Sequence, residues 1–469
     1  MLNLKLGSQH IQETIHEKSI EILENTGVIF NYEPALELLK SKGAKIEGEK
    51  AFIPRALVEE CLKTCPEQFT LSAVNPDRDA LFGKTDDFLV LPNLGPVFIQ
   101  ELDGKRRPGE MQDYINVTRL SQASNLVDVV GSCPIDAAQV DPDTKFLQMI
   151  HMAGRHSDKP IMCCTGAPQV MDREMELVAL IHGGPGAMES KVITGTSLSP
   201  LSPLAYAEDA AYALMAFAEK GQMAIIAGAP MSGISAPVSI TGTTVLINVE
   251  FLAGMVLAQC AGPGAPVVYA TTASAGNMRS ATYVTGIPDT TLLNNFSAQM
   301  GQFYKVPTRS VGSATDAKMP DMQAGYEAMQ NLMVIGMSGI SAVYETLGTV
   351  DALMSVSYEK FMIDLELISR TKEIVRGVDE SMENLLADEI AQIGANGTFL
   401  TMPTTLKACR ERWSPDISDW WTYDHWKKND CPHLLATAGE KCRDILDRPE
   451  DQFLSPDQEK AVQAFINSI

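Results

Sequence analysis

The chain repeats a short apolar run followed by a longer segment whose apolar residues lie three and four positions apart. The runs of strand length are VDVVGSC from 127, PIMCCTG from 160, KVITGTS from 191, QMAIIAG from 222, PVVYATT from 266, VPTRSVGS from 306 and ISAVYE from 340. Helical spacing lies between them, at 146–153, 170–181, 206–218, 246–259, 291–304 and 322–337. Consecutive apolar positions are typical of strands covered on both faces. The alternation predicts parallel strands joined by right-handed helical crossovers.

An eighth strand at 352–356, before a helix from Tyr358, would close these units into a (β/α)8 TIM barrel. An open doubly wound sheet is the alternative, but no GxGxxG turn follows the first strand, and we favour the barrel. We predict an α/β fold with this barrel at 106–377. N-terminal helices and a β-rich segment packed on the barrel occupy 1–105, and a helical C-terminal extension occupies 378–469.

The charges are unevenly distributed. The 469 residues contain 37 Lys and Arg against 59 Asp and Glu, a formal net charge of −22. This disfavours nucleic acids and anionic membrane surfaces as partners, because both require clustered basic residues. Between Lys220 and Arg279 the one charged residue is Glu250, but prolines interrupt the stretch, so we expect a buried core and not a membrane span. The N-terminus has no apolar leader, which favours the cytoplasm.

TIM barrels carry their active sites at the C-terminal ends of the strands. The segments there are CTGAP (164–168), GTSLSP (195–200), AGAPMSG (227–233), TTASAG (271–276), GSATDAK (312–318) and YETLG (344–348). Small residues open a cavity and present backbone N–H groups to a small polar or anionic ligand. Short polar turns are also a purely structural need of any barrel, so both interpretations stay open.

Two charged residues lie in apolar surroundings. Glu250 is either a buried acid satisfied by backbone donors or a site residue with a raised pKa. Arg309 could pair with a substrate carboxylate or neutralise Glu250, Asp316 or Glu345. The sequence has no GxSxG, HExxH or P-loop motif, and its histidines are scattered. We therefore expect neither a His-centred nucleophilic mechanism nor a metal site.

All four tryptophans fall in RWSPDISDWWTYDHW, between Trp413 and Trp426. A local aromatic cluster that pins the C-terminal tail to the barrel explains them most simply. The alternatives are a partner-binding surface or part of a cage for a cationic ligand, because aromatic faces attract quaternary ammonium groups.

The run NVEFLAGMVLAQCAGPGAPVVYATTASAGNMRSATYVTGIPDTTLLNNFSAQMGQFYKVPTRSVGSATDAKMPDMQAGYEAMQ, at 248–330, resembles the core of the trimethylamine methyltransferase superfamily. The N-terminal NTGV, the stretch PNLGPVFIQELDGKRRPGEMQDYINVTRL and the ERW of the tail extend the similarity over nearly the whole chain. The resemblance implies a TIM barrel that moves a methyl group from an amine to Co(I) of a separate corrinoid protein. The chain lacks the DxHxxG that holds a cobalamin base, so we expect it to bind no cofactor and the cobalamin to belong to the partner.

Founding members of the superfamily carry pyrrolysine near the segment that corresponds to 344–349. Ordinary residues stand there in this chain, which argues against trimethylamine as its substrate. Members without pyrrolysine use quaternary amines such as glycine betaine, proline betaine and carnitine, in methanogenesis or acetogenesis. The resemblance thus implies a quaternary amine:corrinoid methyltransferase, which we expect to be a homo-oligomer.

Methyl transfer of this kind needs no acid, base or metal, because Co(I) is a strong nucleophile and a quaternary ammonium leaves as a neutral amine. A carboxylate against the ammonium would stabilise the ground state more than the transition state, so we expect an aromatic and apolar cage, with Tyr344 and Tyr269 as candidates. Arg309 or backbone N–H groups would hold the substrate carboxylate. The candidate catalytic residues are Tyr344, Glu345 and Glu250, with the glutamates orienting donors, and the candidate binding residues are Tyr269, Arg309, Thr346, Gly348, Asp316 and Phe98.

Two other functions stay open at this point. A TIM-barrel lyase or isomerase of a small carboxylic acid would use Glu250 or Glu345 as general base. A betaine-binding protein without catalytic activity is the other possibility. Which betaine would be used depends on the volume of the cavity, which the sequence does not give.

Overall fold

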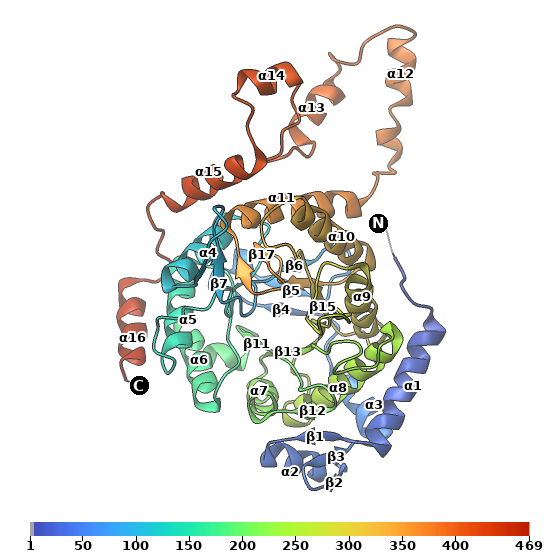
Figure 1. Cartoon of the computed structure of the whole chain (residues 1–469), viewed down its shortest axis with the longest axis vertical. Coiled ribbons are helices and arrows are strands. Elements are labelled where there is room, and N and C mark those ends of the chain that lie inside the picture. The colour runs from blue at the N-terminus through green and yellow to red at the C-terminus, as the bar shows by residue number, and fades with distance from the viewer. Residues whose placement is uncertain (1–3, 469) are drawn as a thin grey trace.

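Eight parallel strands form a closed ring in the computed structural model, which describes residues 4–468 (Figure 1). Six of them hydrogen-bond in the order β11-β13-β14-β15-β16-β6, and β9 pairs with β10. The Asp128 amide donates to the Val90 carbonyl and the Cys163 amide to the Gly195 carbonyl, each at 2.9 Å, which joins the two groups into a ring. The strands are β6 (Leu89–Val90), β9 (Val130–Gly131), β10 (Ile161–Met162), β11 (Gly195–Leu198), β13 (Met223–Gly228), β14 (Val267–Thr271), β15 (Thr308–Val311) and β16 (Ala342–Tyr344). The predicted TIM barrel is confirmed.

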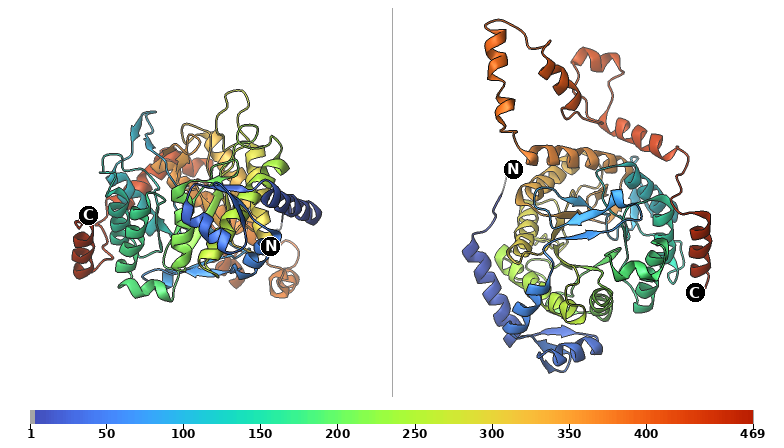
Figure 2. Two further views of the ribbon diagram at one scale, coloured as in Figure 1. Left: turned by 90° about the horizontal axis from the view of Figure 1, so that it is seen from below. Right: turned by 180° about the vertical axis from the view of Figure 1, so that it is seen from behind.

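Helices cover the outside of this ring, as the spacing of apolar residues predicts (Figures 1 and 2). They are α4 (Met111–Ala123), α5 (Lys145–His156), α6 (Pro168–Ile181), α7 (Glu208–Glu219), α8 (Ile240–Ala261), α9 (Pro288–Phe303), α10 (Met322–Ser338) and α11 (Tyr358–Arg376). Local signals fix several of their ends. Asp321 caps the start of α10 by accepting from the Ala324 amide, and Gly339 ends the helix in the left-handed region at φ +68°.

Helix α8 accounts for the weakly charged stretch of the sequence. It is long and apolar enough to cross a membrane, yet 78% of its most apolar window is buried inside the fold. It packs against α1 (Gln9–Asn25), α3 (Arg55–Thr64), α7 and α9. The helix therefore belongs to the core of the molecule.

The expected eighth strand at 352–356 is wrong. Asp351, Ala352 and Leu353 have positive φ and turn the chain, and only Ser355–Val356 form a strand, β18. It pairs with β17 (Thr349–Val350) and β7 (Phe98–Gln100), and β8 (Arg106–Pro108) completes this separate sheet. The eighth barrel strand is instead β6, which lies in the segment expected to precede the barrel and pairs with β16.

The remaining N-terminal segment covers one side and one end of the barrel. The strands β1 (Val28–Phe30), β2 (Lys45–Glu47), β3 (Lys50–Phe52) and β12 (Ala205–Tyr206) form a small sheet beside α2 (Glu33–Ser41). The hairpin of β4 (Phe69–Leu71) and β5 (Ala80–Phe82) shares an apolar cluster with the barrel interior. Leu71 bridges to Val192, which precedes β11, so this hairpin plugs the N-terminal end of the barrel. The C-terminal end of the barrel is not covered by this hairpin and can hold an active site.

The C-terminal extension leaves the barrel and returns to it (Figures 1 and 2). After α11 it forms the short helices η3 (Met382–Leu385), α12 (Ala387–Ile393), α13 (Pro403–Glu411) and α14 (Tyr423–Lys428). Helices α15 (Leu434–Leu446) and α16 (Pro456–Ile466) then pack back on the barrel, α15 against α4 and α11, and α16 against α5 and α6.

Candidate active site

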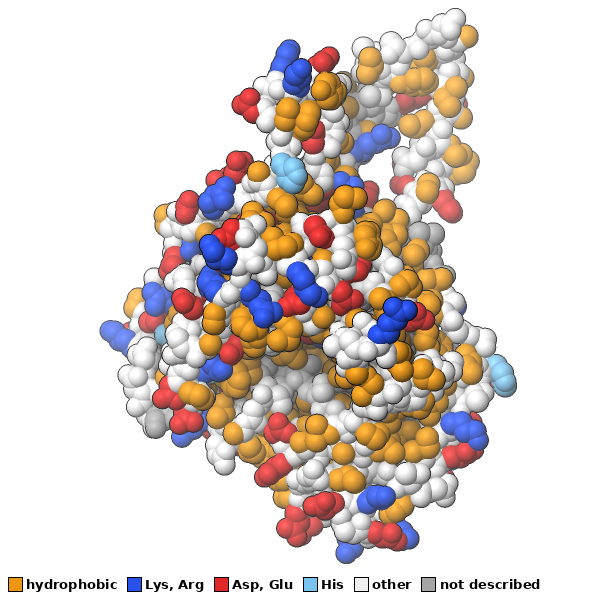
Figure 3. Space-filling view, in the orientation of Figure 1, with side chains coloured by type: hydrophobic (Ala, Val, Ile, Leu, Met, Phe, Trp, Pro, Cys, Tyr) orange, Lys and Arg blue, Asp and Glu red, His pale blue; other side chains and the backbone are white. Residues whose placement is uncertain are grey.

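The C-terminal ends of the strands open on the face seen in Figure 1, and Figure 3 shows that the centre of this face is hollowed. Strand register decides which side chains enter the barrel from there. Val268, Ala342 and Tyr344 belong to one interior cluster. Arg309 pairs directly with Ala342 in the parallel register of β15 and β16. Paired residues of a parallel sheet point to the same side, so Arg309 also points inward.

The side chain of Arg309 is the centre of this site. It is fully buried, and its Nη1 donates to the Thr271 carbonyl at 3.1 Å and to the Thr272 hydroxyl at 2.5 Å. Its Nη2 lies 3.5 Å from Oε1 of Glu345. Its Nε has no hydrogen-bond partner among residues 4–468. A buried guanidinium with a free N–H is well suited to bind an anionic group that enters the barrel.

Tyr344 lies against Arg309. The Cζ atom of the guanidinium is 4.3 Å from the centroid of the Tyr344 ring, a cation–π contact. Burial raises the pKa of the Tyr344 phenol, which keeps it protonated and a donor. Within the described part of the chain its hydroxyl also lacks a partner. Two unpartnered donors, the Tyr344 hydroxyl and the Arg309 Nε, thus come from neighbouring strands.

Glu345 balances the charge of Arg309 at the turn after β16. Its φ of +52° places it in the left-handed region, which non-glycine residues rarely adopt. Its Oε2 accepts from the Leu94 amide at 3.0 Å, just beyond β6. Burial raises the pKa of Glu345 to about 7, although the positive charge of Arg309 opposes this rise. Of the three carboxylates that the sequence offers as partners of Arg309, the structure places Glu345 beside it.

Three other candidates shape the loops around the site. Asp316 accepts from the amides of Thr285 at 2.8 Å and Gly286 at 3.0 Å, and so fixes the loop after β14. Thr346 donates from its hydroxyl to the Tyr344 carbonyl at 2.9 Å. The Gly348 amide donates to the buried Asp364 at 2.7 Å. Each of these four hydrogen bonds holds backbone in place.

Gly348 has a clear steric reason to be glycine. Its φ is +79°, and an added Cβ would come within 2.5 Å of the Ser357 carbonyl oxygen. Phe98 lies on β7 in the sheet beyond the barrel, and the Arg106 guanidinium covers its ring at 4.1 Å from the centroid. The structure therefore places Phe98 at the rim and not within the barrel.

Two sequence-predicted residues lie outside the barrel and are corrected here. Tyr269 points outward to α8, where its ring packs at 4.3 Å from that of Phe251 and its hydroxyl donates to Asn248 at 3.3 Å. Glu250 lies on α8 and accepts from the Ser202 hydroxyl at 2.9 Å and the Leu204 amide at 3.0 Å. Burial raises the pKa of Glu250 to about 7. It is the buried acid satisfied by local donors, which was the structural alternative.

Sequence reasoning missed two contributors from the loops. The Thr272 hydroxyl accepts a hydrogen bond from Nη1 of Arg309. The hydroxyl of Tyr283 donates to the Thr272 carbonyl at 2.6 Å. Thr272 stands in the TTASAG segment that the sequence marks as a strand end, but Tyr283 lies in a loop without periodicity. Residues 4–468 hold no group of three or more His, Cys, Asp or Glu placed to bind a metal ion.

Comparison with protein families matches residues 2–468 to the family described as "Trimethylamine methyltransferase (MTTB)". The chain belongs to this family. The predicted resemblance is thereby confirmed over the whole described fold, and the Arg309 site lies in the barrel of an MTTB-family protein.

Relatives of the chain are named as methyltransferases of different amines. The chain is 36% identical to the glycine betaine methyltransferase of Desulfitobacterium hafniense (strain Y51), over 97% of this chain and 95% of the relative. It is 28% identical to the proline betaine:corrinoid methyltransferase of Eubacterium limosum, over 86% and 84%. It is 27% identical to the trimethylamine methyltransferase MttB of Methanosarcina thermophila, over 99% and 97%.

The fold of this MTTB-family chain also has a solved counterpart. The crystal structure of the monomethylamine methyltransferase of Methanosarcina barkeri matches with a TM-score of 0.52, over 95% of this chain and 90% of that one. Sequence identity is 13%, so the likeness concerns the fold alone.

Proposed function

We propose that this chain transfers a methyl group from a carboxylated quaternary amine, glycine betaine first, to Co(I) of a corrinoid on a partner protein. Membership of the MTTB family and the relatives named for glycine betaine, proline betaine and carnitine support this proposal. All three of these amines carry both a carboxylate and a quaternary nitrogen. The observation that carries the proposal is the pair of unpartnered donors, Arg309 Nε and Tyr344 OH, in the barrel interior.

The substrate carboxylate would bind to these two donors. A buried donor without a partner costs about 1–3 kcal/mol, and an incoming carboxylate oxygen relieves that cost at both atoms. The ring of Tyr344 already packs on the guanidinium at 4.3 Å, so we assign Tyr344 to the carboxylate end of the substrate and not to a cage around its methyl groups. The trimethylammonium end then extends toward the hollow, where a corrinoid can approach.

The transfer itself needs little from the protein. The electron pair of Co(I) forms the new Co–C bond, and the C–N bond breaks with its electron pair going to nitrogen. A neutral tertiary amine leaves, methyl-Co(III) forms, and no proton moves. The protein contributes orientation, because a substrate fixed by its carboxylate presents one methyl carbon in line for attack. No carboxylate is required at the methyl end, where it would favour the ground state.

Glu345 would control the availability of Arg309. When Glu345 is ionised it competes with the substrate for the guanidinium and repels the substrate carboxylate. When it is protonated, Arg309 is free to bind the substrate. Since the pKa of Glu345 is raised to about 7, its protonated form is accessible near neutral pH. This role is positioning through Arg309, in contrast to the general base of a lyase.

A corrinoid assay tests the proposal. The chain is mixed under anaerobic conditions with free cob(I)alamin and glycine betaine, and the absorbance change from Co(I) to methyl-Co(III) is followed together with the release of dimethylglycine. The proposal expects both products in equal amounts. Formation of neither with glycine betaine, proline betaine or carnitine, under conditions where a 36% identical relative is active, would overturn it.

A further inference from the structure

The C-terminal extension contains a segment that is almost entirely exposed in one copy of the chain. We name residues 378–433 the arm. Within the described chain, Ile417 is the one buried residue of the arm. Its helices η3, α12, α13 and α14 have 4, 7, 9 and 6 residues. Isolated helices shorter than about 12–15 residues are marginal in water, so these helices need contacts that one copy of the chain does not supply.

The arm is attached to the barrel by contacts between residues 413–417 and α11. The Trp413 indole N–H donates to the Ser369 hydroxyl at 2.8 Å, and the Arg370 guanidinium lies 4.6 Å from the Trp413 ring centroid. Glu366 accepts from the Ile417 amide at 2.8 Å. These contacts all come from α11. Trp413 thus pins the arm to the barrel, as one interpretation of the sequence expects, while the rest of the arm projects beyond α11 (Figures 1 and 2).

Apolar side chains cover the projecting part. Trp420 and Trp421 are each 63% exposed, and the other exposed large apolar side chains are Val378, Met382, Leu385, Leu386, Ile390, Phe399, Leu400, Leu406 and Tyr423. The exposed rings of Trp420, Trp421 and Tyr423 account for about 400 Å², and the other exposed apolar side chains bring the total to roughly 800 Å². That is the area that each partner contributes to a standard stable interface.

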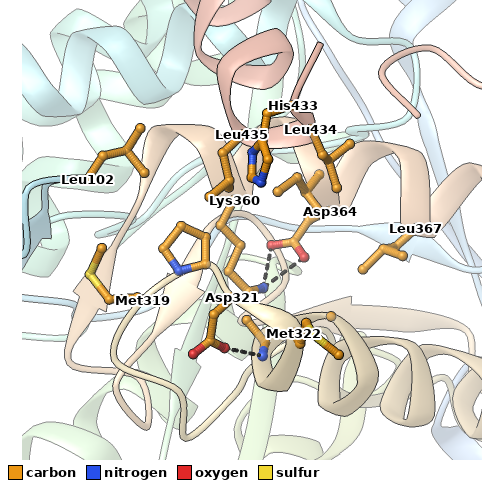
Figure 4. Close-up of a pocket in the computed structure, with 14 residues that line it drawn as sticks. Leu102, Met319, Asp321, Met322, Lys360, Asp364, Leu367, His433, Leu434 and Leu435 are labelled. Carbon is orange, nitrogen blue, oxygen red and sulfur yellow. Dashed lines mark hydrogen bonds and ion pairs between the residues drawn. The ribbon is translucent and has the colours of Figure 1, made fainter. Parts of the chain in front are cut away.

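A groove lined mainly by apolar side chains lies where the arm joins the barrel (Figure 4). Its volume is about 760 Å³, and it lies between the N-terminal parts of α10, α11 and α15 and the turn of the β7–β8 hairpin. Leu102, Met319, Met322 and Leu434 surround its opening, above the buried pair of Lys360 and Asp364. Met322 is 87% exposed at its edge. The cavity is large enough for aromatic side chains such as those of the arm.

We propose that the arm lies across this groove on a second copy of the chain, so that two copies exchange arms around a twofold axis. Such an interface is self-complementary, because each copy offers one arm and one groove. Its apolar character is that of permanent interfaces. A corrinoid protein has to bind and leave the barrel mouth in every turnover, which a permanent apolar interface would prevent. The arm also projects to the side of α11 and leaves the mouth open (Figure 1).

Sedimentation equilibrium and tryptophan fluorescence test this proposal together. The four tryptophans, Trp413, Trp420, Trp421 and Trp426, all lie in the arm, so tryptophan emission reports on the arm alone. At micromolar concentration we expect a particle of twice the 50.9 kDa chain mass or an even multiple of it. On dilution the emission should shift to longer wavelength in step with the loss of mass. A particle of 50.9 kDa at micromolar concentration would overturn the proposal.

Variants at the two separate surfaces sharpen the test. The double variant Trp420→Ser/Trp421→Ser changes the arm, Met322→Glu changes the groove, and each should halve the particle mass. All three side chains are exposed in one copy, so the circular dichroism spectrum of the barrel should not change. Val238→Glu, at an exposed valine outside both surfaces, is the matched control and should keep the mass of the wild type.

Three further outcomes would overturn the proposal. The first is an oligomer that keeps its mass in both the arm and the groove variants. The second is loss of mass in the control Val238→Glu alone. The third is tryptophan emission that ignores dilution and shifts only when a corrinoid protein is added, which would make the corrinoid partner the occupant of the groove. None of these outcomes depends on methyl transfer.

Discussion

The guanidinium of Arg309 lies 4.3 Å above the ring of Tyr344, and both side chains keep a donor without a partner among the described residues. Buried polar atoms in proteins are almost always satisfied. These two orphan donors come from neighbouring strands at the C-terminal end of the barrel, and on them rests the proposal that the substrate supplies the missing acceptors. The predictions below separate this binding role from a purely structural one.

Arg309→Lys should weaken substrate binding while preserving charge. Lysine neutralises Glu345 but cannot reproduce the planar fork of donors. A charge-assisted hydrogen bond is worth about 1.5–3 kcal/mol, so KM for glycine betaine should rise about 10- to 100-fold. Steady-state kinetics with cob(I)alamin measure this. Arg173→Lys, at an arginine on the outer surface of α6, is the control, and an unchanged KM in Arg309→Lys would contradict the assignment.

Tyr344→Phe should lower activity without lowering stability. The lost hydroxyl has no partner in the described chain, so its removal costs the fold nothing and should raise KM about 5- to 10-fold. Tyr206→Phe is the matched control, because its hydroxyl donates to the Glu250 carbonyl at 2.7 Å. That variant should lose about 1 kcal/mol of unfolding free energy and keep its KM. Thermal unfolding and kinetics compare the two, and the opposite pattern would refute the role of Tyr344.

The pH dependence of KM should report on Glu345. Its pKa is raised to about 7, so above that pH it ionises, holds Arg309 and repels the substrate carboxylate. KM should rise with pH above about 7, by up to about tenfold per pH unit, as expected when binding takes up one proton. In Glu345→Gln this rise should disappear while turnover persists. Complete loss of turnover in Glu345→Gln, with an intact fold, would instead support a general base and the lyase alternative.

Glu250 should affect stability and not catalysis. Burial raises its pKa from 4.5 to about 7 in the folded state. Between these values the folded protein binds the proton and the unfolded chain does not, so stability falls as pH rises through this window, by at most about 3 kcal/mol. Denaturant unfolding should show a shallower fall in Glu250→Gln, with KM and kcat near those of the wild type. A large loss of kcat in this variant would return Glu250 to the list of catalytic residues.

The barrel could be predicted from the sequence because seven of its strands lie in apolar runs separated by helical periodicity. The eighth strand could not, because β6 sits among the irregular strands of the N-terminal segment, where no helical periodicity sets it apart. Its absence from the prediction also hid Leu94, whose amide orients Glu345. The run at 352–356 resembles a barrel strand in its apolar composition, but the positive φ angles of Ala352 and Leu353 make its first part a turn.

The site could be predicted only in part. Arg309, Tyr344 and Glu345 come together because β15 and β16 are adjacent and their ends carry polar residues. Tyr269 was misplaced because it lies one position out of register with the inward-facing Val268 and Ala270, and a continuous apolar run does not reveal which face each residue takes. Glu250 was a candidate because it is the one charged residue in a long uncharged stretch. A buried structural acid that accepts from the Ser202 hydroxyl has the same sequence pattern.

The most direct test compares glycine betaine with choline, which has the same trimethylammonium group but a hydroxymethyl group in place of the carboxylate. The rate of methyl-Co(III) formation from cob(I)alamin is measured with each at equal concentration below saturation. If Arg309 and Tyr344 bind the carboxylate, glycine betaine should react at least about 100-fold faster. Equal rates with choline, or methyl transfer from trimethylamine alone, would contradict the account.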